Sequence, residues 1–292
     1  MEIKLIAMDM DGTLLRKDNT ISPYTIKVLK QVQKKGVRLA LASGRSYTRL
    51  LSYAKQLEMD RYGGYLIEIN GVAIYDLKNK KRYVKGRIPA KKAQEIFAYF
   101  KQFNVEIIGN MDEGMYDYNP PCILEEKKRY IIDHHMDKNH PLTGGAFNFL
   151  ANAKKGYPDL RYIQEKEEIV DDVNKISVTY WPEEMAKVAQ QAKHDLGDEY
   201  WVGLTTNKWL EVLMPGVTKA YGLEKLSAYT KIPVAAMMAI GDGENDIEML
   251  TYAGVGVAME NALDSVKEIA DEITCSNMED GVAKAILRYL SI

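Results

Sequence analysis

Two short acidic clusters contain the residue types that could do chemistry in this chain. The first is Asp9-x-Asp11 followed by Gly12, and the second is the run 241–246, in which Asp242 follows a glycine. Carboxylates that share a small site repel one another unless a proton or a cation lies between them. Carboxylate oxygens suit Mg²⁺, which takes few carboxylates and completes its shell with waters and substrate phosphate. The two clusters therefore predict a magnesium site if the fold brings them together.

Two further features could hold the oxygens of a bound phosphate. Ser43 and Gly44 follow an apolar run, and Lys219 follows the turn sequence Pro215-Gly216. Each feature also has an ordinary structural interpretation as a loop or a surface lysine, and the acidic runs could be solvated turns or helix caps. Their common position at the ends of predicted strands favours one phosphate-binding site over four unrelated loops.

The elements that must position these residues alternate between strand and helix. Strands are expected at 3–8 and 37–42, with a helix between them that begins at Ser22-Pro23 and stops at Gly36. Toward the C-terminus we expect strands at 234–240, 255–259 and 272–275 and helices at 245–252, 263–270 and 279–289. This alternation predicts an α/β fold with a doubly wound parallel sheet, which binds ligands at the carboxyl ends of its strands.

The middle of the chain has a different texture. Its strands are more polar, as in 175–181, and its loops contain Pro120-Pro121 and Gly144-Gly145. We therefore predict a catalytic core formed by 1–84 and 213–292 and an inserted α+β domain at 85–212. Within the insert, the run 127–129 is expected to lie on an exposed charged helix.

Composition excludes several classes of function. The 292 residues are 46% hydrophobic and 27% charged with a net charge of -2, which offers no basic field for a nucleic acid. No apolar run approaches the roughly 20 residues that a membrane span needs. Cys122 and Cys275 lie far apart, which argues against a disulfide framework or a zinc site. With the first motif already at residue 9, no removable leader is expected, and we predict a cytoplasmic protein.

Two apparent motifs are weaker than they look. Gly241-x-Gly243 after a strand resembles a dinucleotide fingerprint, but Asp246 occupies the place of the third glycine. His134 and His135 are adjacent, and on a helix their side chains would diverge by about 100°, which disfavours joint metal binding.

The four motifs together resemble the haloacid dehalogenase superfamily of aspartyl-phosphate phosphatases. Asn70-Gly71 and the run 253–262 further resemble its Cof-type branch, whose members carry a type IIB cap domain. The long insertion falls between Arg45 and Lys219, as in that branch. The chain departs from the usual pattern at Met214-Pro215 and at Ala220, but no catalytic group is missing.

The resemblance implies a role for each motif residue. Asp9 would be the nucleophile, Asp11 the general acid and base, and Mg²⁺ would be held by Asp9, the backbone carbonyl of Asp11 and Asp242. Residues that would bind phosphate are Met10, Gly12, Thr13, Ser43, Gly44, Lys219 and Asn245. Asp246, Arg45 and Asn70 are expected to orient these groups without contacting the metal or the phosphate themselves.

The resulting functional prediction is a magnesium-dependent phosphomonoester hydrolase for small phosphorylated metabolites, with sugar phosphates as the preferred class. The inserted domain would close over the phosphate and set substrate choice. Two alternatives stay open: a phosphomutase with the same nucleophile, and a regulator that binds a phosphorylated metabolite with weak turnover. The sequence does not indicate the oligomeric state.

Overall fold

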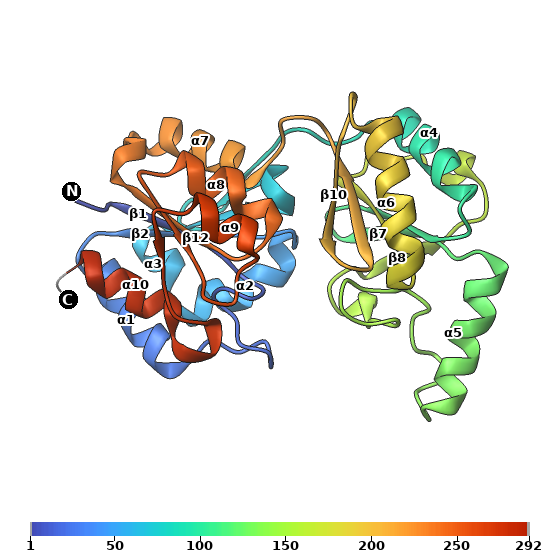
Figure 1. Ribbon diagram of the computed structural model, residues 1–292, viewed down its shortest axis with the longest axis horizontal. Helices are drawn as coiled ribbons and strands as arrows, with labels where there is room; N and C mark the ends of the chain where they lie inside the picture. Colours follow the sequence, from blue (N-terminus) through green and yellow to red (C-terminus); the bar gives the residue numbers. More distant parts are fainter. Residues whose placement is uncertain (1, 291–292) are drawn as a thin grey trace. The chain divides into compact units, whose positions relative to one another are not determined.

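The computed structural model describes residues 2–290, which form two compact units. The first unit contains the chain up to Lys85 and again from Val217 onward, and the second contains Gly86–Gly216 (Figure 1). Each unit has a hydrophobic core of its own. The chain returns to the first unit at Val217, four residues later than the predicted boundary at 213. The last strand of the second unit runs to Leu213, and Met214 packs against that unit's core.

The first unit is built on an eight-stranded sheet in the order β14-β13-β12-β1-β2-β3-β4-β5. The strands from β14 to β3 are parallel, whereas β3, β4 and β5 pair antiparallel at the edge. Strands from the two ends of the chain lie side by side at the centre, where β1 pairs with β12 (Figure 1). The strands are β1 (Leu5–Asp9), β2 (Arg38–Ala42), β3 (Tyr65–Glu68), β4 (Ala73–Asp76), β5 (Lys81–Val84), β12 (Met237–Gly241), β13 (Val255–Ala258) and β14 (Glu272–Ile273).

Helices cover both faces of this sheet, so the predicted doubly wound α/β fold is confirmed. One layer contains α1 (Pro23–Lys34), α2 (Tyr47–Gln56), α3 (Met59–Tyr62) and α10 (Gly281–Tyr289). The other contains α7 (Lys219–Thr230), α8 (Ile247–Tyr252) and α9 (Asp264–Ile269). Among the described residues, no helix is both long and apolar enough to cross a bilayer.

Local signals in the sequence account for several boundaries. The Ser22 hydroxyl accepts a hydrogen bond from the Thr25 amide at 3.0 Å, which caps α1 as expected. The strand expected from Val234 begins only at Met237, because the preceding three residues form a 3₁₀ turn after Pro233. Likewise, the helix expected from Asn245 begins at Ile247 after a 3₁₀ turn.

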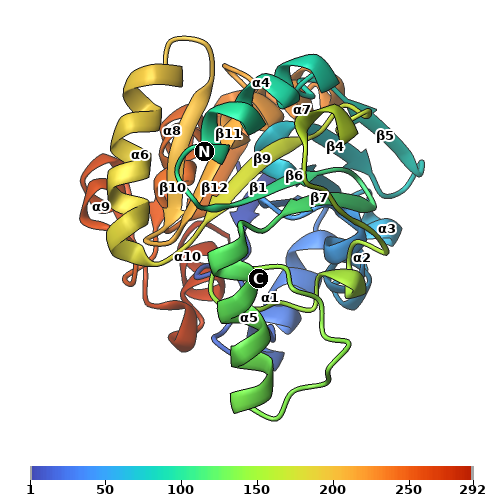
Figure 2. The same cartoon turned by 90° about the vertical axis from the view of Figure 1, so that its right-hand side faces the viewer.

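The second unit is built on a six-stranded sheet in the order β10-β11-β9-β6-β7-β8. Its neighbours are antiparallel except β7 and β8. Helices α4 (Ala90–Lys101) and α6 (Pro182–Leu196) pack on the sheet and enclose the core with it, and α5 (Pro121–Asp133) follows β7 (Figure 2). The strands are β6 (Glu106–Asn110), β7 (Gly114–Tyr118), β8 (Asp159–Tyr162), β9 (Lys175–Thr179), β10 (Trp201–Thr206) and β11 (Trp209–Leu213).

One sequence expectation about this unit is wrong. Lys127 in α5 is completely buried, although the charged run around it predicted an exposed helix. Its ammonium pairs with the Glu106 carboxylate and donates to the Leu142 carbonyl at 2.8 Å. The following residue, Lys128, is exposed as expected.

Candidate active site

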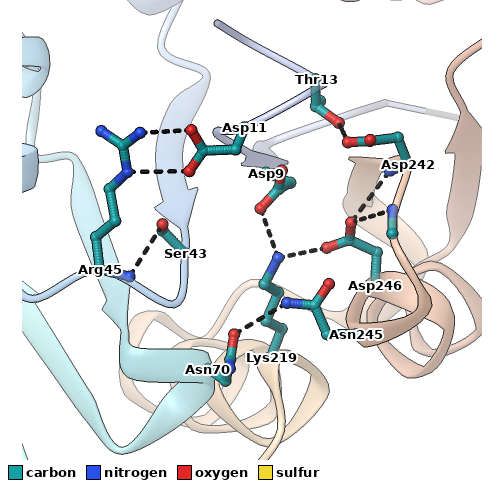
Figure 3. Close-up of polar contacts among 11 residues, drawn as sticks. Asp9, Asp11, Thr13, Ser43, Arg45, Asn70, Lys219, Asp242, Asn245 and Asp246 are labelled. Carbon is teal, nitrogen blue, oxygen red and sulfur yellow. Dashed lines mark hydrogen bonds and ion pairs between the residues drawn. The ribbon is translucent and has the colours of Figure 1, made fainter. Parts of the chain in front are cut away.

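The predicted site residues of the first unit gather at one edge of its sheet (Figure 3). They come from the segments that follow β1, β2, β3 and β12 and from the first turn of α7. The first four segments leave the sheet at the carboxyl ends of parallel strands, the usual ligand-binding edge of this architecture.

Lys219 lies at the centre of the group. Its side chain is completely buried, and its ammonium donates to Asp9 Oδ1 at 2.5 Å and to Asp246 Oδ1 at 2.7 Å (Figure 3). Burial alone would lower the pKa of Lys219, but the carboxylates of Asp246 and Asp9 outweigh it and raise this pKa above its ordinary value. Lys219 therefore carries a fixed positive charge next to Asp9.

Three carboxylates converge beside this ammonium. Oxygens of Asp9, Asp242 and Asp246 all lie within 4.8 Å of one another. Burial raises the pKa of Asp9 well above its usual range, against the opposing effect of Lys219. Burial and the charge of Asp246 raise the pKa of Asp242 to about 7. One lysine does not neutralise three close carboxylates, so the donor set fits a hard divalent cation.

Asp246 holds the loop that carries Asp242. Its Oδ2 accepts hydrogen bonds from the amides of Asp242 at 3.1 Å and Gly243 at 3.0 Å, while its Oδ1 accepts from Lys219. These contacts occupy both oxygens of Asp246 and orient the backbone next to the metal-ligating candidate.

Gly12 allows the first loop to approach this second loop. Its φ of +87° lies in the left-handed region, and a Cβ on it would come within 2.2 Å of Asp242 Oδ2. The neighbouring Thr13 donates its hydroxyl to Asp242 Oδ1 at 2.5 Å. Thr13, expected among the phosphate-binding residues, thus contacts the metal-ligating candidate, and Met10 is completely buried.

The side chain of Asp11 does not point toward the three carboxylates. Side chains two residues apart on a strand project to the same side, which would direct Asp9 and Asp11 together. Here β1 ends at Asp9 and the chain then turns. Asp11 instead accepts both arms of the Arg45 guanidinium, from Nε at 2.9 Å to Oδ2 and from the second arm to Oδ1 (Figure 3). A forked pair of this kind fixes the carboxylate in both position and direction.

The loops after β2 and β3 are joined to each other and to the Asp242 loop. Ser43 Oγ accepts from the Arg45 amide at 3.2 Å, and the Ser43 carbonyl accepts from the Asn70 amide at 3.0 Å. Asn245 then donates its side-chain amide to Asn70 Oδ1 at 3.1 Å. Gly44 lies between Ser43 and Arg45 in the first of these loops.

Gly71, which follows Asn70, has a backbone as constrained as that of Gly12. It has a φ of +103°, and a Cβ on it would come within 2.1 Å of the Thr218 carbonyl. This close approach brings the segment around Asn70 against the start of α7, where Lys219 lies.

Sequence reasoning missed two residues, Asn261 and Glu68, that form hydrogen bonds to the segments after β1 and β2. Asn261 donates its side-chain amide to the Gly12 carbonyl at 2.8 Å and accepts from the Asn277 amide at 2.9 Å. Glu68, completely buried, accepts from the Tyr47 amide at 2.9 Å and from Arg82. Asn261 lies within the run 253–262 that carried the Cof-type resemblance, but nothing in its spacing indicates its partner.

Comparisons with known proteins agree with this geometry. The family model of the haloacid dehalogenase-like hydrolases matches residues 6–286. The chain is 30% identical over 301 aligned positions, spanning both proteins completely, to the 5-amino-6-(5-phospho-D-ribitylamino)uracil phosphatase YitU of Bacillus subtilis. It is 30% identical to the HMP-PP phosphatase of Yersinia enterocolitica, with 99% of this chain and 96% of that protein aligned.

Solved structures give the same answer. A haloacid dehalogenase-like hydrolase from Bacteroides thetaiotaomicron superimposes with a TM-score of 0.77 at 27% identity, covering 99% of this chain and 100% of that one. The resemblance inferred from the four motifs is confirmed. The chain belongs to the haloacid dehalogenase-like hydrolases, and it is a phosphatase.

Proposed function

We propose that this chain is a magnesium-dependent phosphomonoester hydrolase that works through a phosphorylated Asp9. The observation that carries the proposal is the buried ammonium of Lys219, 2.5 Å from Asp9, whose carboxylate clusters with that of Asp242. A nucleophilic carboxylate must meet an anionic ester, and that encounter is favourable only where positive charge is concentrated.

The proposed metal ligands are Asp9, Asp242 and the backbone carbonyl of Asp11. Asp246 supports them, since both of its oxygens are already engaged by Lys219 and by two backbone amides. When bound, Mg²⁺ would screen the charges of nucleophile and substrate and stabilise charge that develops during transfer.

In the first step a carboxylate oxygen of Asp9 attacks phosphorus, and the bond from phosphorus to the leaving oxygen breaks. Lys219, the Ser43 hydroxyl and the Gly44 amide are proposed to hold the phosphate oxygens that do not react. Asn245, in the loop after β12, would orient the phosphate. The leaving alkoxide takes a proton from Asp11.

In the second step Asp11 accepts a proton from water, the water oxygen attacks phosphorus, and the bond to Asp9 breaks to release phosphate. In this structure the Arg45 guanidinium holds both oxygens of Asp11. Proton delivery in the first step and proton uptake in the second therefore both require Asp11 to free an oxygen from this pairing.

For the substrate we propose small phosphorylated metabolites, with sugar phosphates as the preferred class. The named relatives include phosphatases of a phosphoribityl compound and of HMP-PP, which are small and phosphorylated. The second unit is proposed to act as the cap that selects the substrate. The cytoplasm is the proposed compartment, which the two free cysteines favour.

A phosphomutase would share Asp9 and the metal ligands but return the phosphate to a bisphosphate intermediate. Release of phosphate from a monophosphate without added bisphosphate would favour the hydrolase. A binding regulator is disfavoured because nucleophile, lysine and metal ligands are all present.

The test is release of p-nitrophenol or phosphate from p-nitrophenyl phosphate and acetyl phosphate. We expect activity with Mg²⁺ in the wild type, none in EDTA, and none in Asp9→Asn, because an amide oxygen is a poor nucleophile. Asp60→Asn, an exposed aspartate away from the site, should retain wild-type rates. Equal rates in Asp9→Asn and Asp60→Asn would refute the mechanism.

A further inference from the structure

A cavity of about 330 Å³ lies in the first unit between the antiparallel edge of the sheet and α7. Its walls include residues of β3, β4 and β5 on one side and the middle and last turns of α7 on the other. The volume is within the range of small-molecule sites, which begins at roughly 300 Å³. None of the residues assigned above to phosphate or metal lines it, although Gly71, which packs against Thr218 beside Lys219, is part of its wall.

Aromatic rings form one part of the wall. Tyr229 lies 5.6 Å from Tyr83 and 6.2 Å from Tyr65, measured between ring centres. Two of these rings are fixed by their hydroxyls, because Tyr229 donates to Asp76 at 3.0 Å and Tyr65 accepts from Arg38 at 3.0 Å. Tyr83 and Tyr229 nevertheless stay half exposed. The Tyr229 ring is both held by its hydroxyl and half exposed, so it can stack on a flat ligand with little loss of entropy.

Positive charge marks another part of the wall. The ammonium groups of Lys225 and Lys85 lie 4.7 Å and 5.8 Å from the centre of the Tyr221 ring. Lys225 also pairs with Glu224, whereas Lys85 forms no ion pair with any described residue. Both lysines line the cavity, so an anionic group bound there would gain attraction from each ammonium.

The remaining charged group fixes where such an anion would lie. Asp76 also lines the cavity, but it is buried and accepts hydrogen bonds from Tyr229 and from the amide and side chain of Asn79. Its negative charge disfavours an anion at the Tyr229 end. A ligand with an aromatic ring against Tyr83 and Tyr229 and an acidic group directed toward Lys85 and Lys225 satisfies both ends.

We propose that this cavity is a second ligand site, which binds a small planar aromatic compound carrying a carboxylate or a phosphate. The site uses stacking for the ring and the two lysines for the charge. A second copy of the chain on the same face is the competing occupant, because β5 is an edge strand with Tyr83 and Val84 exposed. The fixed Tyr229 ring and the two lysines on the wall favour the small anion.

The probe is 2-naphthoate, with neutral 2-naphthylmethanol as its matched counterpart, titrated against the full-length chain by protein-observed NMR. We expect one naphthoate per chain and binding about three- to tenfold weaker for the alcohol, because each partly exposed lysine contributes up to about fivefold. The double variant Lys85→Met and Lys225→Met should abolish this preference. Lys81→Met, which changes an exposed lysine of β5 that does not line the cavity, should retain it.

A second variant tests the cavity itself. Val84→Trp places a large side chain at a partly exposed wall position, and it should remove binding of both probes while the thermal midpoint stays at the wild-type value. Equal affinity for naphthoate and the alcohol, or naphthoate binding unchanged in the lysine double variant, would overturn the proposal. So would a wild-type dimer in sedimentation velocity that Val84→Trp dissociates, since that result assigns the face to a second copy.

Discussion

Asp242 is the residue whose ionisation should govern metal binding. Its pKa is raised to about 7, chiefly by burial and then by Asp246, whereas an aspartate in an unfolded chain ionises near 3.8. In the metal-free protein the folded state therefore holds its proton more tightly than the unfolded state between these two pH values. Stability of the metal-free protein falls as pH rises through that window and levels off above about 7.

Mg²⁺ binding must show the opposite trend, because it requires the ionised carboxylate and releases the proton. We expect Mg²⁺ to raise the melting temperature more at pH 8 than at pH 6, with affinity about tenfold lower at pH 6 than at pH 8. Differential scanning fluorimetry across Mg²⁺ concentrations measures this. The shift should disappear in Asp242→Asn, and an equal shift at both pH values in the wild type would contradict the assignment.

At the residue scale, the sequence predicted which groups would meet but not how they would pair. Asp9 and Asp242 could be placed together because each follows a predicted strand, whereas Lys219 joins them only through the order of the four motifs. The pairing of Asp11 with Arg45 could not be predicted, because the chain leaves strand geometry after Asp9 and the two-residue alternation no longer applies. Side-chain partners past that point depend on the dihedral angles of the turn.

The turn between β1 and α1 is the element on which the two acidic clusters depend. Gly12 lets this turn lie against Asp242, and Asn261 holds its carbonyl from the far loop. A longer side chain in the turn would push apart the two loops that carry the metal-ligating candidates.

Gly12→Ala should abolish phosphatase activity and weaken Mg²⁺ binding, because its Cβ would overlap Asp242 Oδ2. Gly36→Ala is the matched control: Gly36 has nearly the same φ, +89°, but nothing lies within 4 Å of the place that an added Cβ would take. Both variants should lose about 1 kcal/mol of stability through backbone strain, but only Gly12→Ala should lose activity. Steady-state kinetics with urea denaturation separates the effects, and full activity in Gly12→Ala would refute this role.

Sequence patterns located the long parallel strands and failed at the antiparallel edge. The apolar runs before Asp9, Ser43 and Asp242 read as buried strands because both of their faces are covered by helices. The edge strand β5 has the sequence Lys-Arg-Tyr-Val, with three of its four residues exposed, and offers no such pattern. Its place is set by pairing with β4, a contact that is not visible in local sequence.

At the scale of the whole molecule, the chain contains two separately packed cores and a buried charge cluster that belongs to the second unit. Lys127 pairs there with Glu106, and Glu106 also accepts from the Gly144 amide at 2.7 Å. Close by, Asp117 accepts from the Thr143 hydroxyl at 2.5 Å. Burial and the charge of Glu106 raise the pKa of Asp117 well above its usual range. The cluster thus ties the segment after α5 to the sheet.

Removal of the Lys127 ammonium from this cluster should destabilise the second unit. Lys127→Met should lower the free energy of unfolding by about 3 kcal/mol or more, because it leaves a buried carboxylate without its partner. Lys128→Met, its exposed neighbour, should change stability by about 0.5 kcal/mol or less. Urea denaturation followed by circular dichroism measures both, and equal stability of the two variants would show that the cluster is not a net stabilising feature.

The more polar strands and the Pro- and Gly-containing loops of the middle segment predicted an inserted domain, but they did not predict which residues are buried inside it. Lys127 looked like part of a solvated run, since three consecutive basic residues usually face water. Its burial depends on Glu106, about twenty positions away on another element, and no local pattern records such a partner. That the second unit selects the substrate stays a prediction.

The central claim is that Asp9 carries the phosphate between the two steps. Acetyl phosphate has a good leaving group that needs no protonation, so Asp11→Asn should permit the first step and block the second. We therefore expect this variant with Mg²⁺ to accumulate an acyl phosphate, which borohydride reduction converts to homoserine at residue 9, detectable by peptide mass spectrometry. Homoserine at another residue, or none while the wild type still turns over acetyl phosphate, would contradict the account.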